Sequence, residues 1–137
     1  MYKYVDRPAA ELDPTSRLVL GAMRTWVVQV GQGQCPGTSI GAAFAGRNMI
    51  AALHPLLRMM ALLNRGGLDN FAFCRVACNH VSEHEAIFLQ LMDDAQAGRA
   101  MSLRRAIAML VEEEYVGELF DAVVALGCAK RDVANPA

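Results

Sequence analysis

Apolar residues that recur at every third or fourth position constrain this chain most, because that spacing places them on one face of an α-helix. The pattern begins after Asp13-Pro14, which is typical of a helix start: Asp caps free N–H groups, and Pro has none to cap. It returns after Ser82, which forms a capping-box sequence with Glu85. The spacing predicts one helix over 14–30 and another over 83–96. It predicts a third that Ser102 caps and that carries apolar residues to Val111, and a last one that runs from Leu119 to its end at Gly127.

The stretch between residues 38 and 66 allows two interpretations. Either a short helix over 39–46 precedes a longer one from Asn48, or a single helix is broken near Pro55. Proline lacks a backbone donor and clashes with the preceding turn, so we expect the central helix to be kinked or broken near Pro55. Residues 56–63 are apolar almost all round, which is typical of a central helix or of an interface between subunits.

The order of these segments predicts an all-α fold, a single-domain bundle of about five helices over residues 13–128. A length of 137 residues suits one domain. We expect residues 1–12 to form an extended arm and residues 129–137 to form a flexible tail. Residues 68–81 alternate partly as a strand would, but a lone strand has no partner here. We therefore expect an irregular extended segment or a short helix.

Charge and composition exclude some classes of function. A formal net charge of −1 argues against a broad nucleic-acid-binding surface, so we expect no nucleic-acid partner. No stretch is typical of a secretory signal or of a membrane span, which predicts a cytoplasmic protein with no membrane contact. Because 54% of the residues are hydrophobic, more than a small core buries, we expect a homo-oligomer, most simply a dimer, joined through residues 56–63.

The densest group of reactive side chains is Cys74, Cys78, His80 and His84. Thiolates and imidazoles are ligands that zinc prefers, and iron is a second candidate metal. On one continuous helix the cysteine pair and the histidine pair would lie on faces about 120° apart. The four side chains can therefore meet at a metal only if the helix breaks near Asn79. The alternative is that the cysteines are small buried residues and the histidines lie on the surface.

The same segment allows a catalytic interpretation. His80-Val-Ser-Glu83-His84 matches the H-x-x-E-H string of inverted zinc metallopeptidases, but a helix that starts after Ser82 leaves His80 outside the helix that this motif requires. Cys78 beside a histidine is a candidate nucleophile, and a buried inert thiol is the alternative. The aromatic residues are expected to form the core or, alternatively, a pocket for a small apolar ligand. They are Trp26, Phe71, Phe73, Phe88 and Phe120.

Short sequence motifs in three parts of the chain occur together. They are Arg17-Leu18 with Met23-Arg24, Pro55-Leu56-Leu57-Arg58 with Met60, and Cys78 ahead of Val81-Ser82-x-x-Glu85. The combination resembles an uncharacterised bacterial family of small helical proteins, a domain of unknown function. The resemblance covers residues 13–128. It implies a small helical domain, and it supplies no activity and no site residues.

These patterns together predict a homo-oligomeric structural or regulatory binding module. A small ligand- or metal-binding protein that uses residues 74–84 is the first alternative, and an enzyme with a cysteine nucleophile is the second. The helices are typical of a scaffold, so any function that the sequence reveals is concentrated in residues 71–85.

Overall fold

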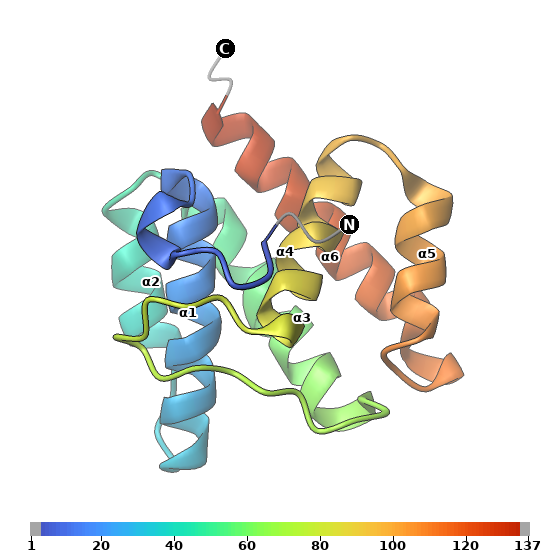
Figure 1. The fold of residues 1–137 in the computed structure, drawn as a ribbon, viewed down its shortest axis with the longest axis horizontal. Coiled ribbons are helices and arrows are strands. Elements are labelled where there is room, and N and C mark those ends of the chain that lie inside the picture. Colours follow the sequence, from blue (N-terminus) through green and yellow to red (C-terminus); the bar gives the residue numbers. More distant parts are fainter. Residues whose placement is uncertain (1–3, 135–137) are drawn as a thin grey trace.

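The computed structural model describes residues 4–134, and this part of the chain is helical and contains no β-strand. The all-α prediction is confirmed, although the described residues form six α-helices rather than about five. The helices are α1 (Pro14–Gly31), α2 (Gly37–Ala45), α3 (Leu53–Gly66), α4 (Glu83–Gln96), α5 (Ala100–Ala108) and α6 (Glu113–Ala134), with short 3₁₀ turns η1 (Ala9–Glu11) and η2 (Ile50–Ala52). Figure 1 shows α1 and α2 on one side of α4 and α5 on the other, with α6 passing diagonally behind α4.

Side-chain caps fix the starts of two helices as the sequence predicts. The Asp13 carboxylate accepts a hydrogen bond from the Ser16 N–H at 3.1 Å, and Pro14 opens α1. At the start of α4 the Ser82 hydroxyl accepts from the Glu85 N–H at 3.2 Å, while the Glu85 carboxylate accepts from the Ser82 N–H at 2.9 Å. Each cap satisfies donors that the first helical turn leaves free.

The predicted kink in the central helix is not confirmed. The chain ends α2 at Ala45, forms η2, and starts α3 at Leu53, so Pro55 stands in the first turn of α3. In that turn the backbone N–H has no intrahelical partner, and the missing donor of proline costs nothing.

The apolar face of α3 forms the centre of the core. It packs chiefly against α6 and also contacts α1 and α2. Leu56, Met59 and Met60 are each at most 2% exposed. Of the two roles that the apolar pattern allowed, α3 has that of a central helix, because its apolar side chains are covered within one chain. None of the helices in the described residues is long and apolar enough to span a bilayer.

The last two helices differ from the prediction at their ends, and α6 begins at Glu113 rather than at Leu119. Ser102 lies within the first turn of α5, which begins at Ala100 just after Gly98 in a left-handed conformation (φ +76°). Gly127 does not end a helix, since α6 runs through it to Ala134. Residues 129–134 are therefore helical rather than a flexible tail, and the side chains of Ala129 and Lys130 are buried. Residues 135–137 of the predicted tail lie outside the described residues.

The predicted N-terminal arm, of which residues 1–3 lie outside the described residues, is packed onto the fold. Tyr4 and Leu12 are buried. The backbone of residues 6–9 hydrogen bonds to residues 79–81, through Asp6 N–H to Val81 C=O (3.2 Å), Val81 N–H to Arg7 C=O (3.2 Å) and Ala9 N–H to Asn79 C=O (2.8 Å). The arm thereby holds the chain just before α4.

For two glycines of α6, substitution by alanine is expected to change the free energy of unfolding in opposite directions. A Cβ at Gly127 would lie 2.8 Å from the Ala95 Cβ and 3.3 Å from the Met92 carbonyl oxygen, so Gly127→Ala forces α4 and α6 apart. We expect a loss of about 1–3 kcal/mol in the free energy of unfolding. Gly117 meets no atom within 4 Å, so Gly117→Ala should gain up to about 1 kcal/mol. Urea denaturation measures both. A gain at Gly127 would contradict this close helix contact.

Candidate functional site

Residues 67–82, which we call the crossing loop, connect α3 to α4 without regular secondary structure. Figure 1 shows the loop passing across α1 and then turning back to the start of α4. The segment predicted to be irregular and extended or a short helix is thus irregular. Because such a segment lacks a ladder of its own, its backbone polar groups need other partners. Side chains of α1 and α4 supply five of these hydrogen bonds.

Arg24 of α1 and Glu85 of α4 form an ion pair behind the crossing loop. The Arg24 Nε lies 2.8 Å from Glu85 Oε2, and the Arg24 Nη2 lies 3.0 Å from Glu85 Oε1. The side chains are 2% and 0% exposed. This two-point contact matches the fork of a guanidinium to the two oxygens of a carboxylate, the geometry for which arginine is better suited than lysine.

The other hydrogen-bonding groups of this pair bind the backbone of the crossing loop. Arg24 Nη1 donates to the carbonyl of Cys78 at 2.7 Å, and Nη2 donates to the carbonyl of His80. The Glu85 carboxylate accepts from the N–H of Cys74 at 3.0 Å and from that of Ser82. One buried pair thus fixes four points of the loop, and we call it the Arg24–Glu85 clamp.

The clamp also controls the charge state of its own members. The hydrogen bond to Glu85 raises the pKa of Arg24, against the opposing effect of burial. Burial on its own would raise the pKa of Glu85, but the hydrogen bonds from Arg24, Ser82 and Cys74 outweigh it and hold that pKa below its usual value. Both groups are therefore charged at neutral pH.

A second set of contacts holds Ala72, in the half of the loop that approaches α4. Its N–H donates to the Nδ1 of His84 at 2.7 Å, and its carbonyl accepts from the Ser82 hydroxyl at 2.9 Å. The imidazole of His84 also meets the ring of Phe71 edge-on, with 5.3 Å between the ring centres. The imidazole of His84 therefore contacts the crossing loop at two adjacent residues.

The structure does not gather the four predicted metal ligands. Cys74 and Cys78 lie close enough to share a side-chain hydrogen bond. His84 instead binds Ala72, and His80 approaches Cys78 through its backbone N–H, which lies 3.4 Å from the Cys78 Sγ. Within residues 4–134 no group of three His, Cys, Asp or Glu side chains could hold a metal ion. The chain is irregular on both sides of Asn79, so no helix is broken there and the angles of a continuous helix do not apply.

The two thiols of the crossing loop differ in acidity. The hydrogen bond from the His80 N–H and the one shared with Cys74 lower the pKa of Cys78, and the charge of Arg24 contributes in the same direction. Burial raises the pKa of Cys74 to about 11, and Cys78 and the charge of Glu85 add to that shift. Cys78 is thus the more reactive member of the pair, because the thiolate is the nucleophilic form.

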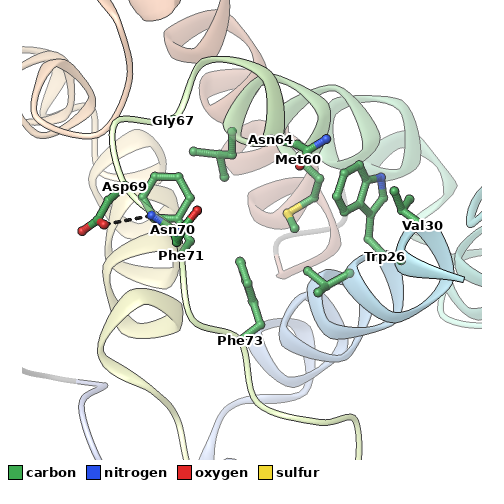
Figure 2. Close-up of a pocket in the computed structure, with 12 residues that line it drawn as sticks. Trp26, Val30, Met60, Asn64, Gly67, Asp69, Asn70, Phe71 and Phe73 are labelled. Carbon is green, nitrogen blue, oxygen red and sulfur yellow. Dashed lines mark hydrogen bonds between the residues drawn. The ribbon is translucent and has the colours of Figure 1, made fainter.

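A cleft of about 350 Å³ opens where the first part of the crossing loop faces α1 and α3. Its apolar wall includes Trp26 and Val30 of α1, Met60 of α3, and Phe71 and Phe73 of the loop, and Asn64 lies at its edge. Figure 2 shows Trp26 beside Met60, with Phe71 and Phe73 across the opening. We call it the aromatic cleft.

Phe88 of α4 supports the loop side of the aromatic cleft from behind. It is fully buried. Phe73 stacks on it, with ring centres 5.6 Å apart and planes 13° apart, and Phe71 meets it edge-on at 5.3 Å. Both arrangements are favoured geometries for aromatic pairs. Phe88 is thus a core residue, whereas Phe71, Phe73 and Trp26 are only half-buried and line the cleft.

Local sequence patterns do not predict the clamp, because its two members are 61 positions apart. Glu85 was identified only as a capping residue, and it serves the cap and the ion pair at once. The signal that could find it is Arg24 itself, a charged residue whose neighbours on the same helix face, Leu20, Val27 and Val28, are apolar. A charge on an apolar face needs a partner, since burial of an unpaired charge is prohibitively costly.

Comparison with known proteins adds no relative. No family model matches the chain, and no curated protein or solved structure matches it either. The resemblance to an uncharacterised bacterial family therefore stays a prediction.

Proposed function

We propose that this protein binds a small, neutral, planar molecule in the aromatic cleft. The observation that carries the proposal is the position of Trp26, a large apolar side chain left half-buried at the side of a cavity opposite two phenylalanines. A side chain of this size normally belongs to a core or to a binding surface. A volume of about 350 Å³ lies at the lower end of the range for small-molecule pockets.

The groups around the cleft indicate the chemistry of the ligand. Aromatic and thioether side chains favour a flat apolar body. The amides of Asn64 and Asn70 at the edge offer one hydrogen-bonding end. Asp69 is the one charged residue among the described residues that line the cleft, and its Oδ1 accepts the Asn70 N–H at 2.8 Å. With no cationic side chain in this lining, the cleft suits a neutral ligand better than an anion.

Fluorescence quenching of Trp26 tests the proposal directly, because it is the single tryptophan of the chain. The probe is 4-bromobenzamide, whose bromine quenches an indole on contact and whose amide matches the asparagines. We expect saturable quenching with a Kd of about 1 mM or tighter, within reach of so small a ligand. Phe73→Ala, which removes one wall, should weaken binding roughly tenfold.

Two further variants separate binding from folding. Asn64 is exposed, so Asn64→Ala should preserve the fold and still weaken binding of the amide. Met109 is 80% exposed and does not line the cleft, so Met109→Ala should leave the quenching curve unchanged. Linear quenching without saturation, equal in all four proteins, would show that Trp26 merely collides with the probe and would refute the proposal.

The homo-oligomer predicted from the sequence stays a prediction. The apolar face of the helix that motivated it packs within one chain, while Leu57 is half-buried and Arg58 and Ala61 are exposed on the same helix. The zinc or iron site also stays a prediction. Elemental analysis of the purified protein and sedimentation at micromolar concentrations test the two predictions separately.

A further inference from the structure

Cys74 and Cys78 flank a turn on the crossing loop. The Cys78 N–H donates to the carbonyl of Arg75 at 3.0 Å, so residues 75–78 form a turn directly after Cys74. The thiols are close enough to share a hydrogen bond, and both are free and only half-buried. Two thiols in contact on an accessible turn meet the first requirement for a disulfide, which is a short distance between the cysteines.

The Arg24–Glu85 clamp holds both ends of this turn in place. It binds the N–H of Cys74 through Glu85 and the carbonyl of Cys78 through Arg24, at 3.0 and 2.7 Å. The relative position of the two cysteines is thereby fixed by a buried ion pair rather than left to a mobile loop. The positive charge of Arg24 also favours a thiolate nearby.

We propose that Cys74 and Cys78 form a reversible disulfide when the protein meets a hydroperoxide, with Cys78 as the attacking thiol and Cys74 as the resolving thiol. This inference is independent of the ligand proposed for the aromatic cleft. It assigns the two cysteines a redox role in place of the metal site that the sequence predicts.

The reaction has two steps that balance. The Cys78 thiolate attacks one oxygen of the hydroperoxide and breaks the O–O bond; with one proton, the other oxygen leaves as water or an alcohol, and Cys78 becomes a sulfenic acid. The Cys74 sulfur then attacks the Cys78 sulfur, forms the S–S bond and releases the hydroxyl with the Cys74 proton as water. The peroxide gains the two electrons that the two thiols lose.

The difference between the thiols supports this order of attack. Cys78 has the lowered pKa, so it supplies the thiolate for the first step. The raised pKa of Cys74 depends partly on Cys78. Burial is the largest cause of that shift, so Cys74 stays a thiol during the first step and is left to act as the resolving partner.

The test is treatment of the whole reduced protein with one equivalent of hydrogen peroxide. We expect the count of free thiols to fall from four to two, the intact mass to fall by about 2 Da, and peptide mapping to find a Cys74–Cys78 link that dithiothreitol removes. In Cys74→Ser the reaction should stop at a sulfenic acid on Cys78, which dimedone traps. Cys78→Ser should react roughly tenfold more slowly than the unmodified protein.

Cys35 provides the internal control, because it is an exposed free cysteine far along the chain from the pair. Cys35→Ser should leave the rate and the Cys74–Cys78 product unchanged. Equal oxidation of all four cysteines, or dimedone labelling of Cys74→Ser that favours Cys35 over Cys78, would overturn the proposal. A product that dithiothreitol does not reduce would also overturn it, since the disulfide must be reversible.

Discussion

Arg24→Met is expected to lower the free energy of unfolding by about 3–5 kcal/mol, the cost of breaking a fully buried ion pair. The substitution leaves the carboxylate of Glu85, which is 0% exposed, without its counter-ion. It also removes the donors to the carbonyls of Cys78 and His80, so the crossing loop should lose order together with stability. Urea denaturation followed by circular dichroism measures the first effect, and amide hydrogen exchange of residues 74–82 measures the second.

Arg58→Met is the matched control for this substitution. Arg58 forms an ion pair with Glu118 at 3.8 Å, but the two side chains are 45% and 59% exposed. An exposed pair contributes little, so we expect a change below about 1 kcal/mol. If the two variants lost similar amounts of stability, the clamp would be no more important than a surface contact, and its role in holding the loop would be wrong.

The pH dependence of the free energy of unfolding provides a second test of the Arg24–Glu85 clamp. Because the pKa of Glu85 is lowered in the folded state, its charge stabilises the fold above its unfolded value of about 4.3, and this contribution is lost as the pH falls through the folded value. Glu85→Gln cannot titrate. The stability difference between the two proteins should therefore be full near pH 7 and shrink as the pH falls below about 4. A constant difference would show that the carboxylate charge is irrelevant.

The features that the sequence predicts well are local ones. The starts of α1 and α4 depend on residues within one turn of each other, and Asp13 and Ser82 form the caps that their spacing predicts. The same reasoning fails where a contact between residues far apart in the sequence determines whether a helix ends. Gly127 is typical of a helix stop, but here it allows α4 and α6 to approach closely, and no local pattern distinguishes the two uses.

The candidate site could be located from the sequence but not assembled from it. The sequence predicts residues 71–85 as the segment that carries chemistry, and this segment contains most of the crossing loop, half of the clamp and one wall of the cleft. Arg24 and Trp26 come from α1, more than 40 positions earlier. The metal hypothesis used the angles of an ideal helix, which do not apply to an irregular loop whose course is set by hydrogen bonds to side chains.

The predicted and the observed environments differ most at Lys130. It falls in the stretch predicted to be a flexible tail, yet it is 5% exposed. Its Nζ donates to the Ser16 hydroxyl at 2.7 Å and lies 3.5 Å from the carboxylate of Asp93. The Tyr4 hydroxyl donates to the same carboxylate at 2.5 Å, and burial together with this bond raises the pKa of Tyr4. These contacts join the N-terminal arm, α1, α4 and α6.

Lys130→Met is therefore expected to lower the free energy of unfolding by about 2–4 kcal/mol, because it removes a buried cation beside the carboxylate of Asp93 and the donor to a buried hydroxyl. The value lies below that for Arg24→Met because Asp93 is 16% exposed and keeps some contact with water. Arg131→Met is the control: Arg131 is the next residue and is exposed, so its change should stay within about 0.5 kcal/mol. If Lys130→Met were as harmless as Arg131→Met, residues 129–134 would behave as the tail that the sequence predicts, and the packing of the last turns of α6 would be wrong.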